Sequence, residues 1–184
     1  MELTESVLLY RAGRLNESRS TLEDYIVTYG DSGDALNLKA LNLWDSGKVA
    51  ESVEVFQRAV ELQPNSAIIR GNYGCALFAT HRIEEATAAV RSALDLNPDL
   101  TYLYEWLGDF YRDKGDEASA VREYTRAKEF AERDTRIDPS SLSARQRKER
   151  IYRKLGEYDK ADETHRETEK IQRDALYQGD SSNM

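Results

Sequence analysis

The side chains of this sequence that could do chemistry are few and widely spaced. The only cysteine, Cys75, precedes His81 by six residues, and residues share a helix face at a spacing of three or four, so a cysteine–histidine nucleophile pair is not favoured. The carboxylate pairs Glu84–Glu85 and Asp116–Glu117 stand at expected helix starts, where acidic side chains interact favourably with the helix dipole. The sequence also lacks HExxH, GxSxG, CxxC and phosphate-loop motifs. We therefore predict no catalytic residue and no enzymatic activity.

Composition excludes several further classes of function. The chain has 26 Lys and Arg against 34 Asp and Glu, which gives a formal net charge of −8 and argues against nucleic-acid binding. One cysteine and two histidines form no ligand cluster, so we expect no metal and no cofactor. Residues 1–4 lack a basic segment, and the apolar run at 7–10 is too short for a signal peptide or a membrane span. We expect a cytoplasmic protein that does not enter a membrane.

The strongest pattern is an internal repeat with a period of 34 residues. Residues 47–59 return as 81–93 and again as 115–127. Within each repeat, apolar residues recur at three- and four-residue spacing, which predicts two amphipathic helices. The period divides the chain into five units, 1–32, 33–66, 67–100, 101–141 and 142–175.

Small residues recur where the two helices of a unit would cross, and they identify a family. The first helices carry Ser6, Ala40, Gly74 and Gly108, and the second helices carry Ser18, Ser52, Ala86, Ala120 and Ala161. With the 34-residue period, this pattern resembles the tetratricopeptide repeat (TPR) family over nearly the whole chain. The resemblance implies an all-α fold, a right-handed superhelical α-solenoid of tandem helix pairs, as one array over residues 1–177.

Turn and end signals set the expected helix boundaries. Gly13, Gly47, Gly115 and Gly156 stand between paired helices, where a positive φ ends the first helix at little cost, and His81 holds the same position in the third unit. We interpret His81 as a turn residue rather than a ligand or base. Pro64, Pro98 and Pro139 are expected to follow the ends of second helices.

The last two units depart from the period. Residues 128–134 are inserted in the fourth unit, and seven residues are about two helical turns, so its second helix should extend over roughly 117–136 without losing its apolar phase. In the fifth unit we expect a polar second helix at 158–177, as a solenoid cap requires, with His165 packed within the cap. Residues 178–184 have no periodicity and are expected to be disordered.

The resemblance implies that the first helices of successive units line a concave groove. The residues assigned to its peptide-binding surface are Asn37, Leu41, Trp44, Asn72, Cys75, Phe78, Tyr102, Glu105, Trp106, Asp109, Arg147 and Arg150. The first three units contribute apolar, aromatic and amide groups, the fourth is acidic and the fifth is basic. Residues 145–154 alone carry a net charge of +5.

Two interpretations remain open for these groove residues. Trp44, Phe78 and Trp106 are either core residues or exposed anchors that carry binding energy. The basic stretch 145–154 is either a solvated helix face or a site for an acidic peptide, with RNA as a weaker alternative because only Tyr152 offers a stacking platform.

A carboxylate clamp of the kind found in TPR co-chaperones of heat-shock proteins is not expected. Its five positions read Asn37, Leu41, Asn72, Tyr102 and Trp106, so one amide matches and both basic pairs are missing. The two asparagines could still form hydrogen bonds with the backbone of a ligand.

These observations predict a protein-binding scaffold or adaptor. The expected partner is a protein that supplies an extended segment or a helix, with apolar anchors followed by acidic residues near Arg147 and Arg150. Two alternatives remain. One is a self-associating assembly protein, a homo-oligomer held through Leu3, Val7, Leu8, Leu9 and Tyr10, and the other is a small chaperone of the TPR secretion type.

Overall fold

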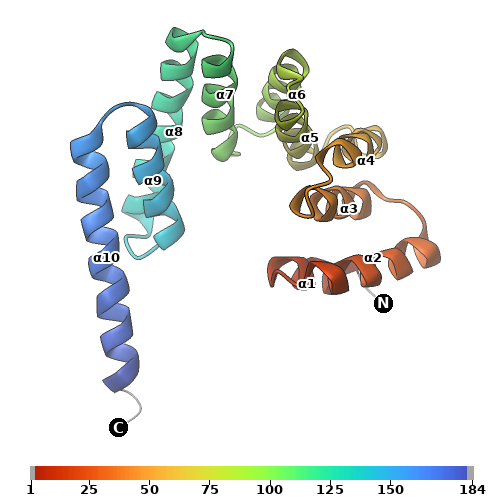
Figure 1. Cartoon of the computed structure of the whole chain (residues 1–184), viewed down its shortest axis with the longest axis horizontal. Helices are drawn as coiled ribbons and strands as arrows, with labels where there is room; N and C mark the ends of the chain where they lie inside the picture. Colours follow the sequence, from red (N-terminus) through yellow and green to blue (C-terminus); the bar gives the residue numbers. More distant parts are fainter. Residues whose placement is uncertain (1–2, 182–184) are drawn as a thin grey trace. The chain divides into compact units, whose positions relative to one another are not determined.

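The protein is a series of helical hairpins, seen in a computed structural model that describes residues 3–181, with side chains described for residues 3–174 (Figure 1). Every regular element within the described residues is an α-helix, so the expected all-α class is confirmed. The helices are α1 (Leu3–Arg11), α2 (Leu15–Tyr29), α3 (Gly33–Asp45), α4 (Val49–Leu62), α5 (Ala67–Ala79), α6 (Ile83–Leu96), α7 (Tyr102–Asp113), α8 (Glu117–Ile137), α9 (Leu142–Lys154) and α10 (Tyr158–Ser181).

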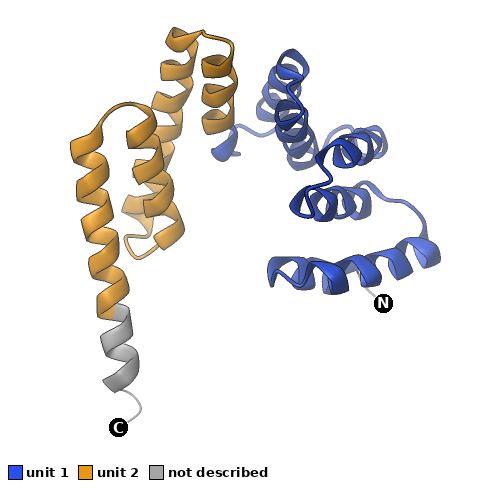
Figure 2. Ribbon diagram, viewed as in Figure 1, with its two compact units in different colours: residues 1–103 blue, residues 104–184 orange. Residues whose placement is uncertain are grey.

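The chain forms two compact units, Met1–Leu103 and Tyr104–Met184 (Figure 2). From here on, "first unit" and "second unit" mean these two parts, and the five 34-residue segments are called repeats. The first contains α1 to α6 and the first two residues of α7. The second contains the rest of α7 with α8, α9 and α10. The division of residues 1–177 into five repeats within one array stays a prediction.

Serine side chains start several first helices. Ser32, Ser66 and Ser141 precede α3, α5 and α9, and each hydroxyl accepts a hydrogen bond from the backbone N–H three residues later, at 3.2, 3.4 and 3.4 Å. Such a cap satisfies one of the N–H groups that a helix start leaves without a partner. Recurrence of the cap at equivalent positions fixes where successive hairpins begin.

The turns within the hairpins have the predicted conformation. His81 has φ 61°, and the four glycines at the equivalent position also have positive φ. Since an L side chain is strained in this region, His81 is tolerated by the turn rather than required by it. The helices α4, α6 and α8 each end two residues before a proline, as expected.

The small residues at the helix crossings are explained by the space available to them. A Cβ added to Gly108 would lie 2.4 Å from Cε1 of Tyr124, and one added to Gly74 would lie 2.6 Å from Cγ2 of Val90. Both large partners are fully buried. Each glycine is therefore a notch that accepts a side chain from the second helix of its own hairpin.

The seven-residue insertion lengthens α8, as predicted. This helix has 21 residues, compared with 14 in both α4 and α6. The added turns keep the apolar face in phase, because Ala131 is fully buried with Ala127 and Ile151 in one cluster. Phe130, also in the insertion, stacks on Tyr104 with ring centroids 5.4 Å apart. The extension is thus part of the core of the second unit.

Two expectations about the last hairpin are wrong. The helix α10 continues to Ser181, so residues 178–181 are helical rather than disordered; residues 182–184 lie outside the described residues. His165 is not packed in a cap: its side chain is 52% exposed, and its Nδ1 lies 3.1 Å from Oε2 of Glu149. The buried face of α10 is formed by Ala161, Thr164 and Thr168 instead.

The first helix is less available for self-association than its sequence indicated. Leu3, Val7 and Tyr10 pack against a buried cluster of Leu22, Ala35 and Leu38. Leu9 is partly buried, and Leu8 stays largely exposed at 61%. The apolar surface that α1 leaves open is therefore small.

Candidate functional site

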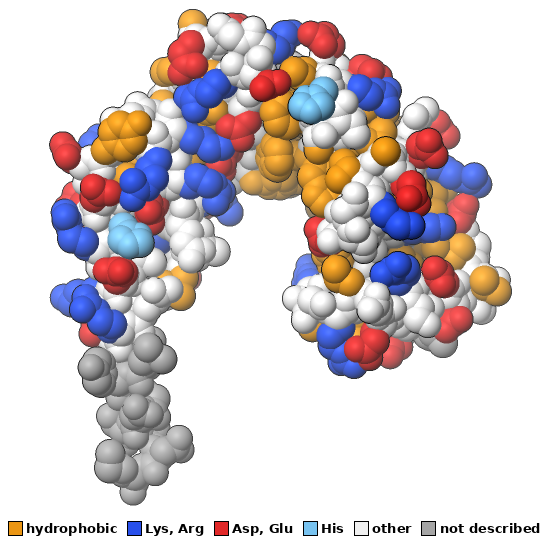
Figure 3. All heavy atoms as spheres, viewed as in Figure 1, with side chains coloured by type: hydrophobic (Ala, Val, Ile, Leu, Met, Phe, Trp, Pro, Cys, Tyr) orange, Lys and Arg blue, Asp and Glu red, His pale blue; other side chains and the backbone are white. Residues whose placement is uncertain are grey.

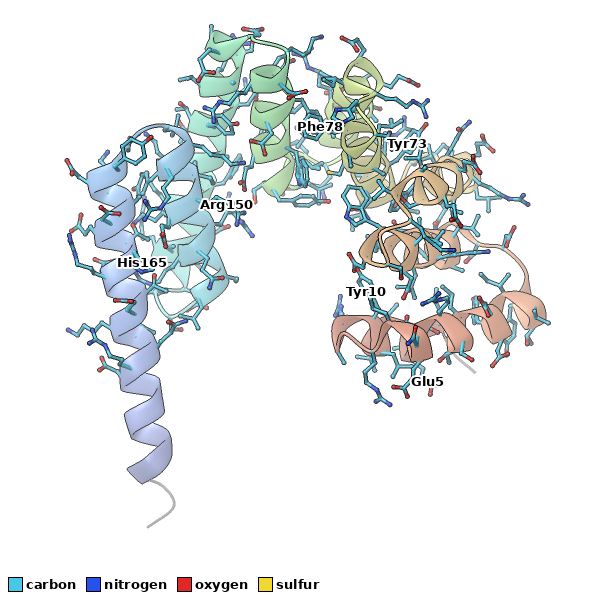
Figure 4. All side chains as sticks on the ribbon, in the orientation of Figure 1. Glu5, Tyr10, Tyr73, Phe78, Arg150 and His165 are labelled. Atoms are coloured by element: carbon cyan, nitrogen blue, oxygen red, sulfur yellow. The ribbon has the colours of Figure 1, made fainter. Side chains whose placement is uncertain are left out.

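The predicted groove residues of the first unit lie on α3, on α5 and at the first residue of α7. Figure 4 labels one of them, Phe78 on α5. Neighbouring first helices are in contact, α1 with α3 and α3 with α5. Two hydrogen bonds join side chains across these contacts. The hydroxyl of Tyr10 donates to Oδ2 of Asp45 at 2.7 Å, and Nδ2 of Asn72 donates to Oδ1 of Asn37 at 3.0 Å. The first helices thus form a continuous surface within this unit.

The Asn37–Asn72 pair leaves complementary groups for a ligand. An amide side chain has an acceptor oxygen and a donor nitrogen, and the mutual bond uses one of each. Nδ2 of Asn37 and Oδ1 of Asn72 remain, on side chains that are only partly buried. Together they offer one donor and one acceptor, which is what the C=O and N–H of a peptide unit require.

Aromatic and aliphatic side chains flank this amide pair. Leu41, Trp44 and Phe78 are each partly buried, so each packs against its neighbours and also presents surface. In the space-filling view, hydrophobic side chains gather over α5 (Figure 3). Trp44 and Phe78 are therefore neither fully buried core residues nor fully exposed, and their role as binding anchors stays a prediction.

Cys75 lies beneath this surface rather than on it, so its assignment to the groove lining is wrong. It is 7% exposed, and burial raises the pKa of its thiol to about 12. Burial and the neighbouring Cys75 also raise the pKa of Tyr102 to about 12. A thiol that stays protonated at neutral pH is a poor nucleophile, so Cys75 has a packing role.

The predicted groove residues of the second unit form a network of ion pairs. Nε and Nη2 of Arg150 donate to the two carboxylate oxygens of Glu105 at 2.6 and 2.8 Å. Nζ of Lys154 lies 3.0 Å from Glu105 and 2.6 Å from Oδ2 of Asp109. The hydroxyl of Tyr124 donates to Asp109 at 2.6 Å. Two acidic residues of the fourth repeat, Glu105 and Asp109, are thus paired with Arg150 and Lys154 of the fifth.

Electrostatics favour the charged forms of Glu105 and Arg150. Burial opposes the charge on Glu105, but the hydrogen bonds and charges of Arg150 and Lys154 outweigh it and hold the pKa of this carboxyl below its usual value. The same contact raises the pKa of Arg150. Burial and the hydrogen bond to Asp109 raise the pKa of Tyr124 far above its usual value.

These pairs bear on the expected site for acidic ligand residues, which stays a prediction. Arg150 is engaged by Glu105, and Nη1 of Arg147 lies 3.2 Å from Oδ2 of Asp134. An acidic segment would compete with a carboxylate of the chain itself at each position. The surface of the second unit at Glu105, Asp109 and Arg150 is therefore held together internally, with Trp106 partly buried beside it.

The network could have been found in the sequence from a double spacing. Glu105 and Asp109 are one helical turn apart, Arg150 and Lys154 are also one turn apart, and the interval between the pairs is 45 residues in both cases. A net charge summed over each repeat does not reveal this match, because it carries no information on the spacing of the charged residues.

Other sites of chemistry are not supported within the described residues. No group of three His, Cys, Asp or Glu residues in this part of the chain could hold a metal ion. No described helix is both long and apolar enough to cross a lipid bilayer. Cys75 and His81 do not form a pair, because the first is buried in α5 and the second is exposed in the turn that follows.

Tandem helical hairpins whose first helices lie side by side define a class of protein, the helical-repeat proteins. The chain belongs to the tetratricopeptide repeat family, whose model matches residues 3–67 and 73–139. Membership supports a role as a protein-interaction scaffold, because proteins of this family bind other proteins and are generally not catalysts.

Named relatives share the repeat over part of their length. The chain is 29% identical to the Hsp70-Hsp90 organizing protein of Triticum aestivum over 108 residues, which cover 59% of this chain and 17% of that protein. It is 29% identical over 156 residues to the BBSome complex member BBS4 of Bos taurus, covering 84% of this chain and 28% of that protein. The chain thus spans less than a third of the length of these relatives.

Solved structures support the fold. The protein TTC0263 of Thermus thermophilus superposes with a TM-score of 0.72 at 19% identity, covering 90% of this chain and 87% of that one. PilF of Pseudomonas aeruginosa gives a TM-score of 0.64 at 19% identity, with 92% and 74% covered. The α-solenoid class of the fold is confirmed by these neighbours.

Proposed function

We propose that this protein is a non-enzymatic adaptor that binds an extended segment of a partner protein on the first helices of its first unit. The observation that carries the proposal is the Asn37–Asn72 hydrogen bond, which leaves a donor and an acceptor on one surface. A ligand backbone would bond to both, and its apolar side chains would lie against Leu41, Trp44 and Phe78.

The contacts of the second unit indicate that the proposed ligand does not depend on acidic residues. Because Arg147 and Arg150 are paired with Asp134 and Glu105, the ligand gains little from acidic residues there. We assign recognition to the amide pair and the aromatic side chains of the first unit. The single cysteine of the sequence is a free, buried thiol, which is compatible with the cytoplasm as the proposed place of action.

A peptide-display selection tests this function. Random peptides are selected on the full chain, and the dissociation constants of the enriched peptides are measured by fluorescence anisotropy. Trp44→Ala and Asn72→Ala should each weaken binding at least tenfold. Val27→Ala is the matched control, since Val27 is 87% exposed on α2 and should leave binding unchanged.

Two results would contradict the proposal. One is the failure of any peptide to be enriched. The other is equal affinity of the enriched peptides for the wild type, Trp44→Ala and Asn72→Ala. Circular dichroism of each variant verifies that the helices are intact.

A further inference from the structure

An open cavity lies in the second unit, toward the C-terminal end of α8, where the insertion lengthens this helix. It has a volume of about 350 Å³ and is lined by side chains of α8, α9 and α10. The lining residues are Glu132, Thr135, Arg136, Arg145, Lys148, Tyr152 and Glu167. Glu132 belongs to the inserted residues 128–134. Part of the wall therefore comes from a feature of the sequence that the 34-residue repeat does not explain.

The cavity and the ion pair of Arg150 lie on different sides of α9. Successive residues of a helix are rotated by about 100°, so Lys148 points in roughly the opposite direction to Arg150. Arg150 contacts Glu105 on α7, whereas Tyr152, one turn after Lys148, donates its hydroxyl to Glu132 on α8 at 2.8 Å. The basic segment 145–154 therefore has two faces, and the ion pair with α7 occupies one of them.

Both carboxylates of the cavity already accept a hydrogen bond within the chain. Oε1 of Glu132 accepts from the hydroxyl of Tyr152. Oε2 of Glu167 accepts from Nη1 of Arg145 at 2.7 Å, and Nε of Arg145 donates to the carbonyl of Pro139 at 2.8 Å. The Arg145 side chain is 12% exposed, so these two bonds fix its guanidinium in the wall.

Two cations at the cavity have no carboxylate partner among the described residues. Arg136 is exposed in the last turn of α8 and forms no ion pair with this part of the chain. Nζ of Lys148 lies 5.6 Å from the ring centroid of Tyr152, which is a cation–π contact and leaves its charge without a counter-ion. The three cations and two carboxylates of the lining give a formal net charge of +1. The cavity therefore offers more N–H donors than acceptors, which favours an anionic ligand.

We propose that this cavity binds the phosphoryl group of a phosphorylated side chain in a partner protein. A phosphate monoester carries a charge of about −1.5 to −2 at pH 7 and three acceptor oxygens, so it matches two unpaired cations better than a carboxylate does. Arg136 would donate two N–H groups from α8, and Lys148 would supply a compact charge from α9. The site goes beyond the proposed function, because it lies on the second unit and does not depend on the amide pair of the first.

A nucleic acid fits this cavity less well. Its successive phosphates need a track of cations, whereas Glu132 and Glu167 lie in the same lining as the two unpaired cations. The chain as a whole also carries a formal net charge of −8. A single phosphoryl group avoids this repulsion because it needs one position between Arg136 and Lys148.

Four short peptides test the occupant. They are acetylated and amidated peptides of glycine and alanine that differ in one central residue, which is phosphoserine, phosphotyrosine, glutamate or serine. Binding to the full chain is measured by amide chemical-shift changes, with inorganic phosphate and a uridine oligonucleotide as further probes. At least one phosphopeptide should bind about fivefold more tightly than the glutamate peptide, with shifts at the end of α8 and in α9. The serine peptide should cause no shifts.

Four variants locate the site. Arg136→Ala and Lys148→Met each remove one cation and should weaken the phosphopeptide about threefold. Lys39→Ala is the matched control, since it removes the same charge from an exposed position on α3 and should leave the affinity unchanged. Glu132→Gln keeps an acceptor for the hydroxyl of Tyr152 but removes a negative charge, so it should tighten binding about twofold. Because Arg136 is exposed, its variant keeps the test informative if Lys148→Met does not fold.

Four results would overturn the proposal. They are equal affinity for the phosphopeptides and the glutamate peptide, unchanged binding in Arg136→Ala, weaker binding in Glu132→Gln, and tighter binding of inorganic phosphate or the oligonucleotide than of either phosphopeptide. Failure here is distinguishable from failure of the proposed function. Trp44→Ala should weaken the displayed peptides and leave the phosphopeptide unaffected, so loss of the first without any binding of the second would overturn the cavity site alone.

Discussion

The contact between Glu105 and Arg150 should carry a measurable part of the stability of the second unit. The Glu105 side chain is 9% exposed and receives two hydrogen bonds from Arg150 and a third contact from Lys154. Removing one partner of a fully buried ion pair costs about 3–5 kcal/mol, and an exposed pair contributes about 0–1 kcal/mol. Since the Arg150 side chain is 55% exposed, Glu105→Gln should lower the free energy of unfolding by about 2 kcal/mol.

The assay is urea denaturation of the full chain in a Trp44→Phe background, where the fluorescence of Trp106 reports on the second unit. The matched control is Glu117→Gln. The Glu117 carboxylate lies 3.1 Å from Arg112, and the two side chains are 63% and 39% exposed, so its loss should change the free energy of unfolding by less than about 0.5 kcal/mol.

Acid provides a second readout of the same contact. The pKa of Glu105 is lower in the folded protein than its usual value of 4.5, so the stabilisation is fully present above that value and is lost as pH falls through the folded pKa. Wild type should lose stability below about pH 4.5 more steeply than Glu105→Gln. Equal stability of the Glu105→Gln and Glu117→Gln variants at pH 7, or parallel acid curves for wild type and Glu105→Gln, would refute this reasoning.

Three further predictions concern single residues. Cys75, whose thiol pKa is raised by burial to about 12, should react with iodoacetamide at pH 8 only after denaturation, and prompt alkylation of the folded chain would contradict its packing role. His81→Gly should raise the free energy of unfolding in urea by about 1 kcal/mol because φ is 61°, whereas His81→Ala should not; a stabilising alanine would exclude strain as the cause. Gly108→Ala should lower the free energy of unfolding by about 1–2 kcal/mol despite its better helix propensity, and a double-mutant cycle with Tyr124→Leu should show that the cost depends on the ring.

The hairpins could be predicted from the sequence because their determinants are local. The 34-residue period, the residues between paired helices and the prolines after α4, α6 and α8 each depend on a few neighbouring residues. The length of α8 followed from the insertion alone, since Ala131 kept the apolar phase. The extra helical residues 178–181 were missed because they lack the apolar periodicity on which the prediction relied.

The site was harder to predict because it depends on the rotation of one helix against another. The sequence placed Cys75 and Asn72 on one face, but the rotation of α5 against its neighbours buried the first and exposed part of the second. The pairing of Arg150 with Glu105 required the register between α7 and α9, and one turn of offset decides which charges meet.

The exchange of Gly108 and Tyr124 for Glu149 and His165 in the last hairpin bears on how the chain could be rearranged. In the second, third and fourth repeats these positions hold a small residue opposite a buried apolar or aromatic one. At this contact, those three hairpins could replace one another. In the fifth repeat they hold a carboxylate and an imidazole that meet at 3.1 Å, with the imidazole exposed to water. Placed second, third or fourth, the fifth hairpin would put both polar groups at positions that are buried there. The polar pair Glu149 and His165 therefore prevents the fifth hairpin from exchanging places with the others.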